Sequence, residues 1–239
     1  MTEAPVIKIL TLFPDMVRAV LDTSILGRAQ RQGQVRFEVT DIRDFAVDKH
    51  RTVDDTAYGG GAGMIMMAPP VVEAVEAARG RNDATVILTT PQGEIFNEAL
   101  TLEFLEDLQA KGELILICGH YKGIDERARQ LVVTREVSIG DYVLTGGDLP
   151  ALVVADAVTR RISGVLHNGD SAANDSFTEQ REGGLDCQWY TKPPEYRGLT
   201  VPEVLLSGHH ANIEKWRREE AARLTRERRP DLLEDQQED

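Results

Sequence analysis

Three segments rich in glycine and polar side chains have the composition of ligand-binding loops. The first, HRTVDDTAYGGGAGM, starts at His50 and holds four glycines in the five positions 59–63. Glycines allow a ligand to approach the backbone closely and permit turns that side chains forbid. His50, Arg51 and Asp54 supply donors and acceptors for a polar ligand. A flexible surface loop is the alternative interpretation, and the dinucleotide-binding pattern GxGxxG is absent from this segment.

The second segment, CGHYKGIDER, begins at Cys118 and follows a run of aliphatic residues. Ligands of open α/β sheets bind at the carboxyl ends of strands, so Gly119–Gly123 lies where a cofactor loop is expected. Taken alone, the segment is better explained as a tight turn from a strand into a charged helix.

The third segment, SIGDYVLTGGDLP, starts at Ser138 and gives the strongest single signal. Gly140, Gly146 and Gly147 surround a short apolar run directly before a helix. Backbone amides and carbonyls exposed at such glycines can bracket an adenine or a methionine moiety. A hairpin, or a helix N-terminus capped by Asp148, would explain the glycines but not the organisation of the whole segment.

Alternating strands and helices must position these segments. Short aliphatic and β-branched runs predict strands over 6–12, 35–42, 85–90 and 113–119. Helical patterns predict helices over 14–32, 97–110 and 148–162. This alternation indicates an α/β fold, with a mostly parallel sheet covered by helices on both sides.

The amino-acid composition of the sequence changes after Gly164. Residues 165–184 are rich in Gly, Ser, Asn, Asp and Glu, which is typical of a linker or a mobile lid. From Val201 onward the pattern is helical. We therefore expect an α/β domain over 1–164, a flexible connector over 165–184 and a small helical C-terminal domain with an acidic tail over 185–239.

Cysteine usage and hydropathy indicate a soluble cytoplasmic protein without a membrane partner. Cys118 and Cys187 lie far apart and have no CxxC spacing, which argues against a disulfide scaffold or a zinc ribbon. The N-terminus lacks the features of a signal peptide, and no apolar run approaches the ~18 residues of a membrane span.

Net charge leaves the partner undecided. The chain has 27 basic and 40 acidic residues, which gives a formal charge of −13. Nucleic-acid-binding proteins usually carry a net positive charge instead. Basic side chains are nevertheless concentrated between Lys215 and Arg229, ahead of the acidic tail.

The three segments, in this order, resemble the bacterial tRNA (guanine-N1)-methyltransferase family, TrmD. The stretches GVLHNGDSAANDSF, LDCQWYTKPPEYRG and VPEVLLSGHHANIEKWR continue the match, which runs from LTLFPDM to RRPDLL. The resemblance implies transfer of a methyl group from S-adenosylmethionine to N1 of guanine 37, beside the anticodon of tRNA, with no DNA partner.

The resemblance also implies a SPOUT-type sheet with a deep trefoil knot, and a homodimer whose active sites draw residues from both subunits. Knots are exceptional, and strand patterns cannot reveal one. In this family the knot loops hold S-adenosylmethionine in a bent shape, and the matching positions here are 90–92, 119–123 and 138–150. Within them we expect cofactor contacts from Thr90, Pro91, Gly119, Tyr121, Gly123, Ser138, Ile139, Gly140, Asp141, Tyr142, Val143, Leu144, Gly146, Gly147 and Pro150.

The chemistry requires a base and a cation. N1 of guanine becomes nucleophilic only after its proton leaves, and the resulting negative charge moves toward O6. The resemblance assigns the base to Asp175 and the cation to Arg160, with Arg161 one residue out of register. Because an aspartate in water is a weak base for this proton, we expect the linker to close over the guanine and shield Asp175.

Further residues are candidates for substrate contact. The target guanine must be extruded from the RNA stack, and our candidates for contacting it and its neighbours are His50, Arg51, Asp54, Tyr58 and Ser171. Candidates for tRNA phosphates are Lys215, Arg217 and Arg218, for which a solvated helix face is an equally good explanation.

One position departs from the family. Several members carry glutamate where Lys122 stands, and that carboxylate is linked to magnesium-assisted catalysis. A charged lysine cannot ligate Mg²⁺, so the use of this metal stays open.

Three other functions compete with this interpretation. A knotted enzyme acting on a ribose hydroxyl or another base would not need the motif around Asp175. A non-catalytic adenosyl- or RNA-binding module would bind S-adenosylmethionine without transferring a methyl group. A metabolic nucleotide-binding enzyme would suit the acidic charge and would not depend on RNA.

Overall fold

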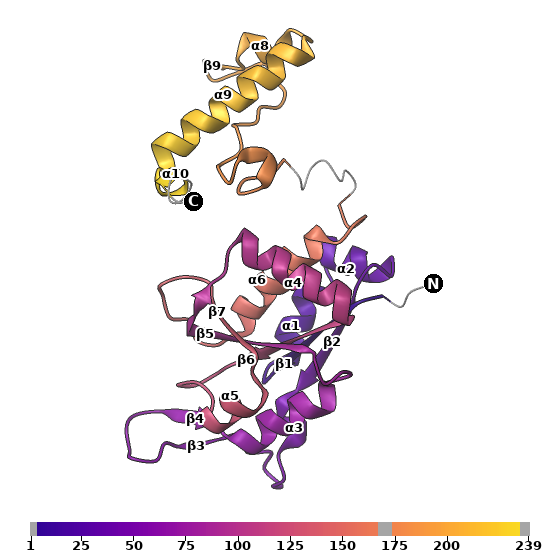
Figure 1. Ribbon diagram of the computed structural model, residues 1–239, viewed down its shortest axis with the longest axis vertical. Coiled ribbons are helices and arrows are strands. Elements are labelled where there is room, and N and C mark those ends of the chain that lie inside the picture. The colour runs from indigo at the N-terminus through magenta and orange to yellow at the C-terminus, as the bar shows by residue number, and fades with distance from the viewer. Residues whose placement is uncertain (1–3, 167–173, 235–239) are drawn as a thin grey trace. The chain divides into compact units, whose positions relative to one another are not determined.

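The computed structural model describes residues 4–166 and 174–234, so Ser171, one of the predicted substrate residues, lies outside the described chain. The chain divides into two compact units, Met1–His167 and Asn168–Asp239, and each is described by itself (Figure 1).

The first unit is built on a five-stranded parallel sheet with the order β2-β1-β6-β5-β7. Its strands are β1 (Val6–Thr11), β2 (Arg36–Asp41), β5 (Thr85–Ile95), β6 (Glu113–Cys118) and β7 (Arg135–Ser138). The four predicted strands are confirmed. Every residue of β1 and β6 is buried, as expected for central parallel strands that are covered on both faces.

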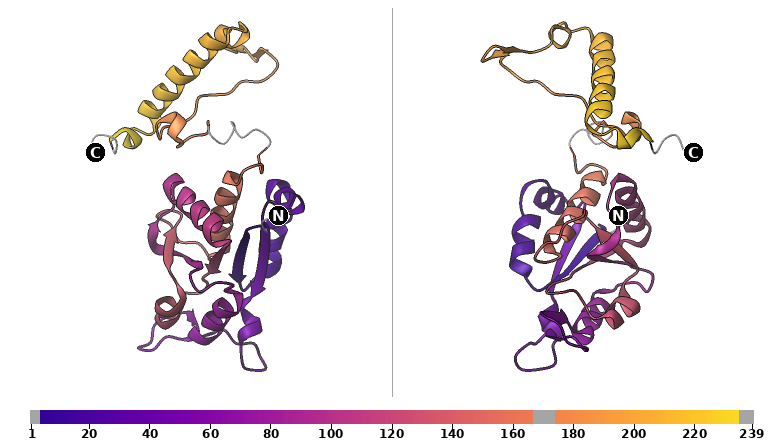
Figure 2. Two further views of the ribbon diagram at one scale, coloured as in Figure 1. Left: turned by 45° about the vertical axis from the view of Figure 1, so that its right-hand side comes forward. Right: turned by 90° about the vertical axis from the view of Figure 1, so that its left-hand side faces the viewer.

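Helices cover both faces of this sheet, as the alternation predicts (Figure 2). One layer contains α1 (Pro14–Leu21), α2 (Ser24–Arg31), α4 (Glu98–Lys111) and α6 (Asp148–Arg161), and the other contains η1 (Ile42–Phe45), α3 (Ala68–Ala78) and α5 (Glu126–Val132). Along β6, Leu114 and Leu116 face the first layer, while Ile115 and Ile117 face the second. This alternation follows from the two-residue period of a strand.

The helix predicted over 14–32 is wrong as a single element. It is two helices, α1 and α2, separated at Asp22 and Thr23. The hydroxyl of Thr23 donates to the carbonyls of Ala19 and Val20 at 3.3 and 2.9 Å, which satisfies acceptors at the end of α1. The break lets both short helices bury an apolar face in the same core.

The glycine-rich first segment forms a hairpin instead of a free loop. Strands β3 (Asp54–Thr56) and β4 (Met64–Met66) pair antiparallel around it. The outer edge of β4 then bonds to the chain after β6, where Lys122 N donates to Met64 O at 3.0 Å and Met66 N donates to Gly123 O at 2.9 Å. The first and second segments of the sequence therefore lie side by side.

A buried ion pair joins two central strands at the amino end of the sheet. Lys8 Nζ lies 2.6 Å from Glu113 Oε2 and donates to Ala78 O at the end of α3. Glu113 also accepts from the amides of Gly80 and Arg81, at 3.0 and 2.7 Å. The pair thereby fixes the turn after α3.

Replacing Lys8 with methionine should therefore lower the free energy of unfolding by about 3–5 kcal/mol, because it leaves a buried carboxylate without its cation. Urea denaturation measures the change. Lys111→Met is the matched control, since the Lys111–Asp107 pair is partly exposed and should contribute at most about 1 kcal/mol. Equal losses in both variants would contradict the argument.

The second unit is described from Asn174 to Glu234. It contains η2 (Glu179–Arg181), a hairpin of β8 (Glu195–Tyr196) and β9 (Leu199–Thr200), and the helices α8 (Glu203–Leu206), α9 (His210–Arg228) and α10 (Asp231–Glu234). The all-helical expectation for 185–239 thus misses a short hairpin. A Cβ atom on Gly184 would lie 2.8 Å from Thr225 Oγ1 of α9, and the amide of Leu185 donates to the same oxygen at 2.9 Å, so the last residue of the predicted connector packs on this helix.

Candidate functional site

A cavity of about 590 Å³ opens at the carboxyl ends of β5, β6 and β7. Its volume falls in the range of small-molecule sites, and its place at the strand ends is where ligands of open α/β sheets bind. Three stretches form most of its wall, namely 88–92, 119–124 and the chain from 137 to 150.

Glycines bring the third stretch against the strand ends. Gly147 N donates to Gly119 O at 2.7 Å, and the buried hydroxyl of Thr89 donates to Gly147 O at 3.1 Å. A Cβ atom on Gly147 would lie 2.4 Å from Thr89 Oγ1 and 2.7 Å from Gly119 N. Only glycine fits here, and the chain that leaves edge strand β7 is thereby held over the ends of β5 and β6.

Strand β5 extends five residues beyond its predicted end and contains an irregularity at the cavity. Its pairing with β7 shifts register between Thr89 and Glu94, which places Thr90, Pro91 and Gln92 in the cavity wall. Arg129 of α5 donates to Gln92 Oε1 at 2.7 Å and pairs with Glu126 and Glu136. The arginine thus joins the side chain of Gln92 to Glu136 of β7.

A polar cluster lies beneath the cavity. The buried carboxylate of Asp148 accepts from the hydroxyl of Thr11, whose oxygen accepts from Phe13 N at 2.8 Å. Burial raises the pKa of the Cys118 thiol well above its ordinary value, and the neighbouring Asp148 carboxylate raises this pKa further. The cluster joins the ends of β1 and β6 to the start of α6.

Because the folded protein keeps this thiol protonated, its stability should fall with pH. Below about pH 8.5 the thiol is protonated in both states, and above it only the unfolded chain releases the proton. Relative to Cys118→Ala, the unmodified protein should lose about 1.4 kcal/mol of unfolding free energy per pH unit above that point. Parallel stability curves for the two proteins between pH 8 and 10 would argue against a raised pKa.

His120 lines the cavity and has an unsatisfied ring nitrogen. The ring makes edge contacts with Phe13 and Tyr121, at centroid distances of 5.1 and 4.9 Å. Its Nδ1 atom is buried and has no hydrogen-bond partner within residues 4–166 and 174–234. A buried nitrogen without a partner is costly, so a polar group of a ligand is a suitable partner.

The cavity gathers the sequence-predicted cofactor residues with a single exception. All of them line it except Asp141, whose side chain is exposed in the same loop. Sequence reasoning missed Ile124 in the loop before α5, and the side chains that come from inside the strands and helices, namely Leu88, Thr89, Glu126, Arg129 and Val137. Because ligands bind at the carboxyl ends of strands, the last residues of each strand and the first turn of the following helix could have been predicted as wall residues.

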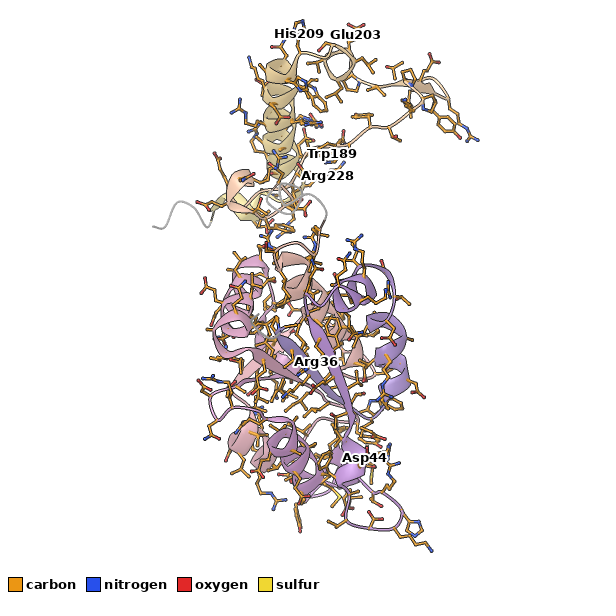
Figure 3. The ribbon with its side chains drawn as sticks, turned by 90° about the vertical axis from the view of Figure 1, so that its right-hand side faces the viewer. Arg36, Asp44, Trp189, Glu203, His209 and Arg228 are labelled. Carbon is orange, nitrogen blue, oxygen red and sulfur yellow. The ribbon has the colours of Figure 1, made fainter. Side chains whose placement is uncertain are left out.

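The predicted substrate residues of the first unit lie on the β3–β4 hairpin and in the loop before it, and none of them is in the cavity wall. Arg51 is paired with Asp41 and Asp44, the latter labelled in Figure 3, so its guanidinium holds the loop before β3. His50 is exposed, Asp54 is half-buried in β3, and Tyr58 is fully exposed at the hairpin tip. Gly63 of the hairpin packs against Lys122, a residue of the cavity wall. A Cβ atom added to Gly63 would lie only 3.0 Å from Lys122 Cγ.

The two predicted catalytic residues belong to different units. Arg160 is half-buried in the last turn of α6. Its neighbour Arg161 forms an ion pair with Glu98 of α4. In the second unit, the carbonyl of Asp175 accepts from the Thr178 hydroxyl at 2.8 Å, and Arg181 Nε donates to Asn174 O at 3.0 Å. Asp175 therefore stands in a turn with fixed backbone.

The basic residues of α9 are largely paired within the helix. Lys215 lies 3.8 Å from Glu219, and Arg217 lies 2.7 Å from Glu214. Arg218 is exposed. Their assignment to tRNA phosphates stays a prediction.

The described residues contain neither a metal-binding group of side chains nor a helix that could cross a membrane. Within residues 4–166 and 174–234, no group of three or more His, Cys, Asp and Glu side chains could hold a metal ion. The cavity wall contains the ammonium of Lys122 and one carboxylate, Glu126. In the same part of the chain, every helix is too short or too polar to cross a bilayer.

Comparison with known proteins identifies the family. The family model described as tRNA (Guanine-1)-methyltransferase TrmD matches residues 6–235. Proteins named tRNA (guanine-N(1)-)-methyltransferase from Desulforamulus reducens and Anaeromyxobacter sp. strain K are 52% and 55% identical to the chain. The alignments cover 96% and 95% of this chain, and 89% and 90% of those relatives. The chain therefore belongs to the TrmD family of tRNA (guanine-1)-methyltransferases, as the resemblance of its motifs predicts.

Proposed function

We propose that this protein is a tRNA (guanine-N1)-methyltransferase that methylates guanine 37, next to the anticodon, in the cytoplasm. The observation that carries the proposal is the cavity in which the second and third sequence segments meet at the strand ends. Relatives with about half of their residues identical carry the name of this activity.

The cavity wall suits S-adenosylmethionine. It combines backbone polar groups at Gly119, Gly146 and Gly147 with apolar side chains such as Leu88 and Leu144. The unsatisfied Nδ1 of His120 adds a polar group. When bound, S-adenosylmethionine supplies an electrophilic methyl group on a sulfonium sulfur.

The path of the chain after β7 supports the proposed trefoil knot. From the edge of the sheet, the third segment returns to β6, where His120 and Gly146 form an isolated bridge. Helix α6 then packs against β1, β6 and α4. The chain thus returns across the ends of strands that precede it, and a knot requires such a return.

Two side chains would carry out the chemistry. Asp175 takes the N1 proton of the extruded guanine, and Arg160 stabilises the negative charge that moves to O6. Arg161, one residue out of register, forms an ion pair with Glu98 of α4. Closure of the segment over 165–184 would shield Asp175 from water and raise its basicity.

A homodimer is supported by an apolar patch on the first unit. Phe13, Met16 and Val20 of the α1 region and Leu149 and Val153 of α6 are each between 41% and 49% exposed. The two helices are in contact. Adjacent exposed apolar side chains mark an interaction surface, and a second copy of the chain is the occupant we propose.

The described residues do not provide a ligand set for Mg²⁺, so no step of this mechanism passes through a metal. The C-terminal unit would contact the tRNA through Lys215, Arg217 and Arg218. Further candidates in the first unit are His50, Arg51, Asp54 and Tyr58. The division into a domain over 1–164, a connector over 165–184 and a domain over 185–239 is part of this proposal.

The test is incubation of the protein with labelled S-adenosylmethionine and unmodified tRNA that carries guanine at position 37. Nucleoside analysis should find 1-methylguanosine, and a transcript with adenine at that position should stay unlabelled. A methylated ribose, another methylated base, or transfer without RNA would refute the proposal.

A further inference from the structure

The second unit contains a cavity of about 490 Å³ that the proposed reaction does not use. It lies between the chain that precedes the β8–β9 hairpin and helices α8 and α9. Both tryptophans of the protein, Trp189 and Trp216, line it together with Tyr190. We call it the aromatic cavity. Trp189 lies alongside α9 (Figure 3).

The aromatic rings are held in place yet remain accessible. The guanidinium of Arg217 lies 4.5 Å from the centroid of the Trp189 ring, and Trp189 Nε1 donates to Asp186 Oδ2 at 2.7 Å. Tyr190 and Trp216 are neighbours, with ring centroids 6.4 Å apart. Trp189 is nevertheless 62% exposed and Tyr190 45% exposed. Exposed apolar side chains that lie next to one another mark an interaction surface, whereas a single exposed one does not.

The lining of the aromatic cavity contrasts with the acidic chain as a whole. Two of its lining side chains are cations, Lys192 and Arg217, and no lining residue is acidic. Glu214 pairs with Arg217 from outside the lining, so Lys192 is the cation without an ion-pair partner among the described residues. Across the chain, acidic residues outnumber basic ones by 40 to 27. A cationic cavity on an acidic protein favours a polyanion over a protein surface of the same acidic kind.

Aromatic rings flanked by cations are the combination that binds unpaired nucleotides. Bases stack on the rings, and the cations neutralise the adjacent phosphates. A base inside a duplex has both faces covered, so only an unpaired base could enter. We propose that the aromatic cavity binds an unpaired nucleobase of the RNA substrate other than the methylated guanine. This inference rests on the proposed function and adds a second contact point for the tRNA.

The position of both tryptophans makes intrinsic fluorescence a reporter of this cavity alone. Unmodified tRNA should quench the tryptophan emission of the full-length protein, and a series of transcripts with single abasic nucleotides should identify the base responsible. Removing that base should restore the emission and weaken tRNA binding by about 5- to 150-fold, the effect of losing one stacked base.

Protein variants give the complementary measurement. Trp189→Ala should weaken tRNA binding by a similar factor, and Trp189→Phe should recover most of the affinity, because phenylalanine still presents a stacking face. Trp189 is mainly exposed, so both variants should fold. Arg223→Gln is the control for charge on α9, since Arg223 pairs with Glu220 and Glu227 and does not line the cavity.

The outcomes separate this inference from the function on which it rests. The inference would be overturned if tRNA did not quench the tryptophan emission and Trp189→Ala bound tRNA as tightly as the unmodified protein. Formation of 1-methylguanosine in the same preparation would leave the enzyme assignment intact. Tryptophan emission that depends on protein concentration without RNA would also overturn it, because a second protein copy would then cover the rings. Absence of any methylated nucleoside would instead remove the proposed function.

Discussion

Replacing Asp175 with alanine should reduce kcat for methyl transfer by about 10²–10⁴-fold, the usual contribution of a positioned base. The affinity for S-adenosylmethionine should stay the same, because all the residues that line the cavity belong to the first unit, whereas Asp175 belongs to the second. Single-turnover methylation of tRNA gives the rate, and calorimetric titration gives the cofactor affinity.

Two further variants sharpen this result. Asp175→Asn keeps the shape of the side chain while removing its basicity, so it should be as inactive as the alanine variant. Glu179→Gln changes an exposed carboxylate four residues later and should leave the rate unchanged. If Asp175→Ala lost cofactor binding as well, the aspartate would have a role in holding S-adenosylmethionine and not in proton transfer.

Gly147→Ala should damage both the fold and the cofactor site. The added methyl group would lie 2.4 Å from Thr89 Oγ1, 2.7 Å from Gly119 N and 3.0 Å from Cys118 Cα. Two of these atoms are backbone, so the third segment must move away from the strand ends. Overpacking of this kind costs about 1–3 kcal/mol, and we expect at least a tenfold loss of S-adenosylmethionine affinity with a lower Tm.

Gly119→Ala is the matched control for folding. A methyl group there would meet Thr89 O and Leu88 Cδ1 at 3.8 and 3.9 Å, which are ordinary contacts, so its Tm should match that of the unmodified protein. A Gly147→Ala protein with normal stability and normal cofactor binding would show that the third segment can move at no cost.

The sequence predicts the central strands well because burial on both faces demands long aliphatic runs, as in β1 and β6. It misses β7, a four-residue edge strand in which only Val137 and Ser138 are buried. It also misses α3, which is apolar over much of its length and begins with Pro69 and Pro70 in its first turn. Elements that are short, or that lack a polar face, carry little periodic signal.

Much of the cofactor site was predictable because glycine positions and family motifs are local features of the sequence. The bulge in β5 was not, since it lies against a strand distant in sequence: a Cβ atom on Gly93 would lie 2.2 Å from Val137 N of β7. Nor was the pairing of Arg51 with Asp41 and Asp44, which places a predicted substrate residue in a structural role. Contacts between side chains distant in sequence have no pattern that a single sequence reveals.

The bond between Thr11 and Asp148 spans 137 residues, and this sets the order of events during synthesis. At ~5–20 residues per second, the end of β1 is synthesised roughly 7–27 s before Asp148 is made. For all of that time, the end of β1 lacks the carboxylate that secures it beneath the cavity. A chain released before α6 is complete would therefore carry every strand of the sheet and still have no place for the cofactor, so the site is the last part of the first unit to be acquired.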